Sequence, residues 1–240
     1  LYLAPTPIGN LSEMTPRCID VMKSVNYIAA EDTRNTVKLL NHFNIEAKLI
    51  SHHEHNLHVA IPKLLSLLEE GESVALVSDA GYPAISDPGY EMVLATIDAG
   101  YNVVPLSGCN ACLDALVVSG IAPQPFMFYG FLSHTNKNKT KELEKLKNIT
   151  YTIVFYEAPH RIKATLDCMM KVLGDRKIAL CREITKKHEE ILRGTISEVL
   201  EVVDELKGEM VIVVEGGTEV TEEETFDQTI TEHVDEFVEK

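Results

Sequence analysis

The sequence of 240 residues has no tryptophan, only five cysteines and no long uninterrupted run of apolar residues. A membrane-spanning helix needs about 18 consecutive apolar residues, so we expect no membrane segment. The cysteine count is odd, and only Cys109 and Cys112 lie close together, which is typical of a reducing compartment rather than a disulfide framework. The first ten residues also lack the basic and apolar regions of a secretion signal. We therefore expect a cytoplasmic protein.

Basic side chains are scarce: 22 lysines and arginines stand against 37 aspartates and glutamates, a net charge of −15. This balance excludes indiscriminate binding of nucleic acid. The charge is unevenly spread, however. Residues 219–240 hold nine acidic side chains and one lysine, whereas residues 133–187 hold 13 basic and six acidic ones. The basic segment allows a local anionic partner, although a solvated helical face explains the same charges.

The first half of the chain alternates short apolar runs with amphipathic stretches of helical period. Strands separated by helices of 10–15 residues predict βαβ units and a mostly parallel sheet. The predicted strands are Tyr2–Ala4, Tyr27–Ala30, Lys48–Ser51, Val74–Ser78 and Val103–Leu106, and the predicted helices are Arg17–Ser24, Thr36–Phe43, Leu57–Glu70 and Tyr90–Ala99.

A turn-rich segment at residues 120–125 separates this pattern from a second one, in which some neighbouring strands are joined by short connections. Short connections favour antiparallel pairing, so the second half predicts a mixed α/β unit. Its predicted strands are Phe126–Tyr129, Thr152–Tyr156, Lys177–Cys181, Glu190–Gly194 and Met210–Val214. The sequence thus predicts two α/β domains, residues 1–122 and 123–217. Residues 218–240 are expected to form an acidic tail, a linker followed by an amphipathic helix.

Two loops rich in proline and glycine are candidates for ligand binding. Residues 5–10 follow the first predicted strand, at the edge where α/β sheets bind ligands, but lack the glycine spacing of a dinucleotide site. Residues 78–89 follow the most apolar strand and combine glycine, proline, serine and aspartate. Such a loop fixes backbone groups in unusual conformations that suit a small polar ligand.

Carboxylates at strand ends are candidates for acid–base chemistry. Glu31 and Asp32 follow one predicted strand, where Asp32 would serve equally well as a helix cap. Glu183 follows another and is surrounded by Arg182, Lys186 and Lys187. A general base beside cations suits a phosphate-bearing substrate, although surface ion pairs explain these residues as well.

Two motifs that suggest metal binding lack the necessary ligands. The histidines between residues 52 and 58 do not form a complete metal-binding spacing, and Cys109 and Cys112 make a single CxxC without a second pair. We therefore expect no metal site.

Seven motifs, in this order, resemble those of the ribosomal RNA small subunit methyltransferase I family, within the tetrapyrrole methylase (class III methyltransferase) superfamily. The resemblance runs from Leu1 to about Gly217. The motifs are APTPIGNL, AAEDTR, SHHEHN, ALVSDAGYPAISDPGY, FYEAPHR, CREITKKHEE and GEMVIVVEGG.

The resemblance implies transfer of a methyl group from S-adenosylmethionine, without a metal, to the 2′-hydroxyl of a cytidine in 16S ribosomal RNA. It also implies a homodimer that acts on the small ribosomal subunit, with the methyl donor between the domains. We predict that the donor is held by Pro7, Asp79, Ile85, Ser86, Asp87, Ala111, Phe131, Leu132 and Tyr156. RNA should contact the basic segment through Lys139, Lys141, Arg161, Arg182, Lys186 and Lys187. The predicted base is Glu183, with Glu31 and Asp32 as alternatives.

The sequence departs from the family at three places and leaves two other functions open. Tyr82 replaces a threonine, Ser107–Asn110 replaces Pro-Gly-Pro-Ser, and Ser133 replaces a proline. One alternative is a methyltransferase acting on a tetrapyrrole carbon, but those enzymes carry GxGxGD where this chain has PTPIGN. The other is an adenosine-binding regulator of the ribosome without catalytic activity.

Overall fold

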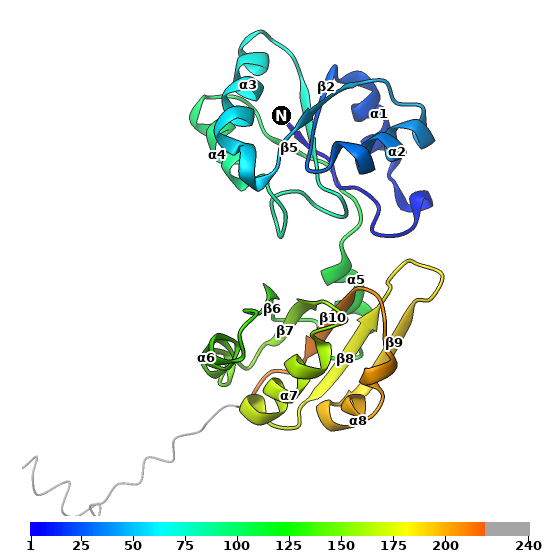
Figure 1. Cartoon of the computed structure of the whole chain (residues 1–240), viewed down its shortest axis with the longest axis vertical. Helices are drawn as coiled ribbons and strands as arrows, with labels where there is room; N and C mark the ends of the chain where they lie inside the picture. The colour runs from blue at the N-terminus through cyan, green and yellow to red at the C-terminus, as the bar shows by residue number, and fades with distance from the viewer. Residues whose placement is uncertain (219–240) are drawn as a thin grey trace, which may run out of the picture.

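The computed structural model describes residues 1–218, which form two α/β domains stacked along the long axis of the molecule (Figure 1). The predicted fold class is confirmed. The first domain has a parallel sheet in the order β3-β2-β4-β1-β5. Its strands are β1 (Tyr2–Leu3), β2 (Tyr27–Ala30), β3 (Lys48–Ser51), β4 (Val74–Val77) and β5 (Val104–Pro105).

The helices of the first domain begin where the sequence provides caps. Thr15 accepts a hydrogen bond from the Cys18 amide, with Pro16 at the first position, where a missing N–H costs nothing. Asp32 caps the next helix in the same way. The helices are α1 (Pro16–Ser24), α2 (Thr33–Phe43), α3 (Leu57–Glu69) and α4 (Tyr90–Asp98), with short 3-10 helices at Leu11–Glu13 and Glu54–Asn56.

The carboxyl ends of the parallel strands face the second domain (Figure 1). There the loops after β1 and β4 are tied together, because Thr6 and Gly81 exchange both backbone hydrogen bonds at 3.0 Å. The Thr6 hydroxyl also donates to the Ser78 carbonyl at 3.1 Å. Both proline- and glycine-rich loops therefore form one rigid floor at this edge of the sheet.

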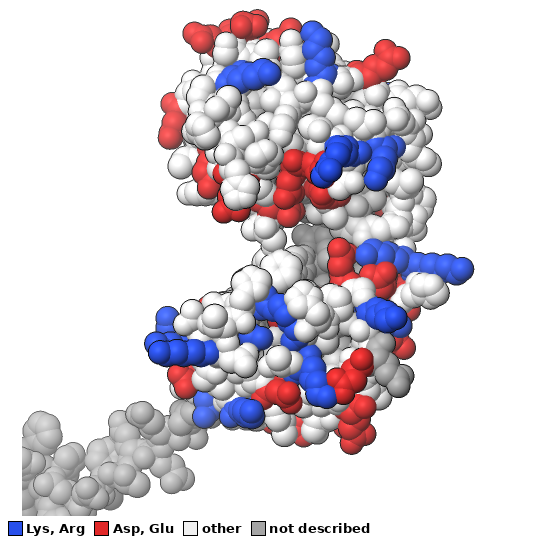
Figure 2. Space-filling view, viewed as in Figure 1, with Lys and Arg blue, Asp and Glu red and all other residues white. Residues whose placement is uncertain are grey.

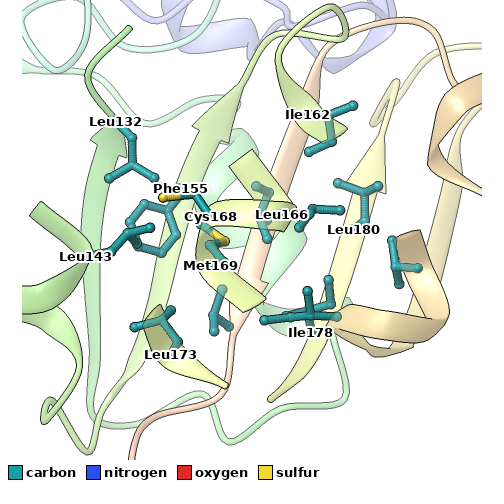
Figure 3. Close-up of a cluster of buried hydrophobic side chains, with 14 of the residues drawn as sticks. Leu132, Leu143, Phe155, Ile162, Leu166, Cys168, Met169, Leu173, Ile178 and Leu180 are labelled. Atoms are coloured by element: carbon teal, nitrogen blue, oxygen red, sulfur yellow. The ribbon is translucent and has the colours of Figure 1, made fainter. Parts of the chain in front are cut away.

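The second domain has a mixed sheet in the order β6-β7-β10-β8-β9, where only β6 and β7 run parallel. Three helices cover one face, and their apolar residues form the largest core, around Phe155 and Leu166 (Figure 3). The elements are β6 (Phe126–Phe131), α6 (Asn136–Leu146), β7 (Thr152–Glu157), α7 (Ile162–Leu173), β8 (Lys177–Arg182), β9 (Glu190–Thr195), α8 (Ile196–Leu200), the 3-10 helix Val203–Glu205 and β10 (Met210–Val214).

Helix α5 (Ala111–Val118) covers the other face of the second sheet, although it precedes the turn at residues 120–125. Its Cys112, Ala115 and Leu116 are buried against β7, β8 and β10. We therefore propose that the domains divide before α5, in residues 106–110, rather than at residue 123. The expected tail, residues 218–240, lies outside the described residues apart from its first position. No helix of residues 1–218 is long and apolar enough to cross a membrane.

A buried polar network joins α6, α7 and the end of β7. The ammonium of Lys139, whose residue is 1% exposed, donates to the Thr165 hydroxyl at 2.7 Å, and that hydroxyl donates to Glu157 at 2.5 Å. Arg161 forms an ion pair with the other Glu157 oxygen at 3.0 Å. Burial lowers the pKa of Lys139, against the opposing charge of Glu157.

This network concerns two residues that were predicted to contact RNA, Lys139 and Arg161. Lys139 cannot contact RNA, because its side chain points into the core between α6 and α7 rather than to solvent. Arg161 is also largely buried, and its guanidinium donates to the Leu132 carbonyl at 2.6 Å. Lys139 lies four and seven residues before the buried Leu143 and Leu146, so it shares the inward face of α6.

We predict that Glu157→Gln destabilises the protein by about 3 kcal/mol or more, because Arg161 would keep a buried charge without its partner. Urea unfolding followed by circular dichroism measures the change. The matched control is Asp204→Asn, which removes the partner of Lys163 in an exposed ion pair and should leave the midpoint unchanged. Equal midpoints for both variants would contradict a structural role for the network.

Candidate active site between the domains

A cavity of about 490 Å³ lies where the two domains meet, at the constriction visible in the space-filling view (Figure 2). This volume is in the range of small-molecule sites. The first domain and the loop before α5 supply one wall and the β8–β9 hairpin the other. The lining residues are Glu13, Thr15, Gly108, Cys109, Asp114, Val118, Ile184, Thr185, Glu189 and Ile191.

The turn after β8 has a strained backbone that presents Thr185 to this cavity. Glu183 and Thr185 both have positive φ, 51° and 69°. Positive φ is rare for a β-branched residue and persists only when the surroundings enforce it. Here the Thr185 amide donates to Glu189 at 2.7 Å and the Glu183 amide to the Glu209 carbonyl at 3.0 Å. The Thr185 hydroxyl oxygen is buried and has no partner among the described residues.

The cavity lining is acidic, since Glu13, Asp114 and Glu189 all contribute to it. Burial raises the pKa of Asp114, and the charge of Glu189 raises it further. Acidic side chains also gather along the lower edge of the first domain (Figure 2). The cavity therefore suits a ligand that carries positive charge and N–H or O–H donors.

A second group of carboxylates lies at the ends of β2 and β4. Burial raises the pKa of Glu31, and the charges of Asp87 and Asp79 raise it further. Burial also raises the pKa of Asp87. Asp79 is held by the side-chain amide of Asn35 at 3.0 Å and by the Asp32 backbone amide at 3.3 Å. Three predicted residues, Glu31, Asp79 and Asp87, are thus close enough to influence one another.

Asp32 and Glu183, both predicted candidates for the base, have structural partners. Asp32 caps α2 and pairs with Arg34 at 2.7 Å, and its side-chain hydrogen bond to Arg34 lowers its pKa to about 2. Glu183 accepts from Lys186 at 3.0 Å and from the Glu209 amide at 3.1 Å. Although burial opposes it, these bonds hold the pKa of Glu183 below its ordinary value. Glu31 is the one of the three whose pKa is raised.

The predicted donor-binding residues are distributed around the amino end of α5. Tyr156 and Phe131 pack ring against ring, with centroids 5.6 Å apart. Burial raises the pKa of Tyr156 to about 12, with contributions from Cys112 on α5 and Asp87 on the β4 loop. Ala111 begins α5, while Ile85 is 63% exposed on the β4 loop, in which Ser86 is also exposed.

Leu132 is also among the predicted donor-binding residues. Its side chain is 2% exposed and belongs to the core beneath α6 and α7. An irregularity in β6 turns this side chain inward, so any contact of Leu132 with the donor would be made by its main chain. Pro7 and Asp79 instead line a smaller cavity of about 200 Å³ beside α2.

The predicted RNA contacts differ in how freely they can reach a partner. Arg182 pairs with Glu190 at 2.5 Å, and Lys186 pairs with both Glu183 and Glu209. Lys141 and Lys187 are exposed. Lys186 also lies against Gly9, where a Cβ atom would approach its side chain to 2.3 Å, so this lysine joins the two domains.

One departure from the family pattern, Tyr82, has a structural explanation. Tyr82, one of the departures from the family pattern, accepts a hydrogen bond through its hydroxyl oxygen from the Gly108 amide at 3.1 Å, which joins the β4 and β5 loops. Within residues 1–218, no group of three or more histidine, cysteine, aspartate or glutamate side chains is placed to hold a metal ion. Sequence reasoning missed Thr185, Glu13 and Asp114, because a positive φ at threonine and a cavity between domains leave no local pattern.

Comparisons with known proteins identify the family of this chain. A family model described as Tetrapyrrole (Corrin/Porphyrin) Methylases matches residues 1–200. Ribosomal RNA small subunit methyltransferase I of Bacillus subtilis (strain 168) is 56% identical over 246 residues, covering 100% of this chain and 84% of that protein. The protein of the same name from Synechocystis sp. is 47% identical over 221 residues, covering 91% and 79%.

Solved structures share the fold at low sequence identity. Uroporphyrin-III-C-methyltransferase from Thermus thermophilus has a TM-score of 0.63 at 17% identity and covers 89% of this chain and 93% of its own. A cobalt precorrin-4 methyltransferase has a TM-score of 0.65 at 16% identity, with the same coverage. The chain belongs to the tetrapyrrole methylase family and, within it, to the ribosomal RNA small subunit methyltransferase I proteins.

Proposed function

We propose that the protein methylates ribosomal RNA of the small ribosomal subunit, with S-adenosylmethionine as methyl donor and without a metal. The observation that carries this proposal is the 56% identity to a relative of that name over the whole chain. The region between the domains supports it, because it contains a cavity, the carboxylate of Glu31 and the packed rings of Phe131 and Tyr156. The protein would act in the cytoplasm, where ribosomes are assembled.

We further propose that the acceptor is the 2′-hydroxyl of a cytidine in 16S ribosomal RNA. The seven sequence motifs support this assignment. A 2′-hydroxyl distinguishes RNA from DNA, and it is a weak nucleophile whose proton must be accepted as the new bond forms. The site should therefore contain a proton acceptor near the place where the donor binds.

The cavity at Thr185 fits the donor. When bound, S-adenosylmethionine supplies a methyl group activated by a positively charged sulfonium. Glu13, Asp114 and Glu189 supply the negative charge that suits this cation, and the unpartnered Thr185 hydroxyl would gain a hydrogen bond. Tyr156 would form the adjoining wall, because Cys112 and Asp114 on α5 lie close enough to raise its pKa.

Glu31 is the proton acceptor that its electrostatic surroundings favour. Its raised pKa makes it a stronger base than Asp32 or Glu183, whose pKa values are lowered. The raised pKa also fixes the direction of the pH dependence. Turnover should fall as the pH is lowered through a value above the ordinary 4.5 of glutamate, because protonated Glu31 cannot accept a proton.

The exposed face of α6 is one part of the basic segment that can meet RNA. Lys137 and Lys141 are exposed and form no ion pair with residues 1–218. Phosphate attraction of this kind supplies affinity without sequence preference.

We also propose a homodimer, for which the exposed Leu113, Val117 and Val118 of α5 offer an apolar surface.

We predict that Thr185→Val lowers the affinity for S-adenosylmethionine by roughly 3- to 10-fold, the effect of one lost hydrogen bond. Isothermal titration calorimetry measures it, and Thr150→Val at an exposed position is the control. Excess chelator should change neither affinity. A chelator-dependent loss would refute binding without metal, and wild-type affinity in Thr185→Val would place the donor elsewhere.

We predict that Glu31→Gln lowers turnover of small-subunit RNA by roughly 10²-fold or more while donor affinity is retained. Glu183→Gln should instead lower the melting temperature, because it loses the charge that Lys186 pairs with. Transfer of labelled methyl groups and differential scanning calorimetry separate the two effects. Loss of turnover in Glu183→Gln at an unchanged melting temperature would assign the base to Glu183.

We predict that the double variant Lys137→Glu, Lys141→Glu binds RNA more weakly and with a smaller dependence of affinity on salt. Filter binding between 50 and about 200 mM salt measures both quantities. Donor affinity should not change, since α6 does not line the cavity. The control is Lys63→Glu with Lys23→Glu on the first domain. An equal loss in the control would show that only net charge matters.

A further inference from the structure

Strand β6 contains an irregularity that changes the direction of its last side chain. Phe128 pairs with Val154 and Gly130 with Phe155, so Tyr129 is an extra residue without a partner on β7. Gly130 has φ of 84°, a conformation that glycine adopts at little cost. Such a β-bulge bends the strand and is common beside functional sites.

The bulge moves Phe131 from one face of the sheet to the other. Phe128 packs on the face that α5 covers, and Tyr129 on the face of α6 and α7. Strict alternation would place Phe131 on the same face as Tyr129. Instead Phe131 pairs with Tyr156 and packs against its ring, on the face of α5.

The ring of Phe131 is held firmly on one side and open on the other. Its side chain is 54% exposed. Without the bulge, the ring would instead point to the face on which α6 and α7 form the core. Tyr156 supports it, and Phe128 supports Tyr156 in turn, with centroids 4.8 Å apart. Helix α5 packs mainly on β7 and β10, and Phe131 at the end of β6 remains accessible to solvent.

The chain after Phe131 is fixed by the buried network described above. The Arg161 guanidinium donates to the carbonyls of Leu132 and Ser133, at 2.6 and 3.3 Å, while the Leu132 side chain is buried. The position of the ring is therefore determined from both sides. A preorganised aromatic surface loses little freedom when a ligand stacks on it.

The surroundings of Phe131 favour a nucleotide over a protein partner. His134, Lys137 and Lys141 follow it in the chain and are exposed, and the two lysines have no carboxylate partner within residues 1–218. Charged residues are depleted from the cores of protein interfaces. Aromatic rings beside cations are instead the usual means of binding unpaired bases, since the ring stacks on the base and the cations meet the phosphates.

We propose that Phe131 is a stacking platform for an unpaired base of the RNA substrate, distinct from the donor cavity. This inference rests on the proposed function for the class of substrate. It departs from the sequence prediction that Phe131 binds the donor. The RNA would then be held by cations on α6 and by one stacked base at the end of β6.

The first test uses steady-state kinetics with small ribosomal subunits from cells that lack the gene. Phe131→Ala should raise KM for the RNA substrate by about 10-fold, while donor affinity and melting temperature stay at wild-type values. Phe131→Tyr, which keeps the ring, should restore KM. Reduced donor affinity in Phe131→Ala, or an unchanged KM, would overturn the inference. Inactive wild-type protein would refute the proposed function instead.

The second test does not depend on catalysis. Because the chain has no tryptophan, Phe131→Trp introduces a single tryptophan at the proposed platform, and its fluorescence can be excited apart from that of the tyrosines. A single-stranded cytidine oligonucleotide should quench its fluorescence on binding. Phe126→Trp, at the other end of the same strand and 37% exposed in the wild type, is the control and should not be quenched. Equal quenching at both positions, or none at Phe131→Trp, would contradict a stacking role.

Discussion

The packing of α5 on the second sheet is the contact on which the rest of the structure depends. Cys112, Ala115 and Leu116 bury one face of this helix against β7, β8 and β10, while the residues before it continue directly from β5 of the first sheet. The carboxyl edge of the first domain is therefore held against the edge of the second. The cavity is lined in part by Asp114 of this helix, and Cys112 and Asp114 also lie close enough to Tyr156 to raise its pKa.

Charge is divided between two sides of the site in a way that suits a cationic donor and an anionic acceptor. The cavity carries carboxylates, whereas Lys137 and Lys141 on α6 are exposed and have no ion-pair partner within residues 1–218. Many other charged side chains serve the fold instead. Lys186 joins Glu183 and Glu209 and lies against Gly9, and Arg161 links β7 to the loop after β6. The basic segment of the sequence thus contains both structural cations and free ones.

Most of the fold follows from local pattern. The strands Tyr27–Ala30, Lys48–Ser51 and Met210–Val214 have the predicted bounds, since apolar runs between turn residues specify strands directly. The local pattern does not reveal which partners a buried polar side chain finds, because these partners come from distant parts of the sequence. Lys139 turns inward because Thr165 and Glu157, from other elements, provide its partners.

Part of the site was predictable from the order of strands and helices along the sequence. Glu31, Asp79 and Asp87 follow strands whose ends meet at one edge, so their proximity is a consequence of topology. Thr185 and the bulge at Tyr129 depend on strained or irregular backbone that no sequence period encodes.

The most direct test of the central claim is nucleoside mass spectrometry of 16S ribosomal RNA from cells with and without this gene. The account predicts a 2′-O-methylcytidine that disappears without the gene and returns with it. An identical set of modified nucleosides in both strains would contradict it.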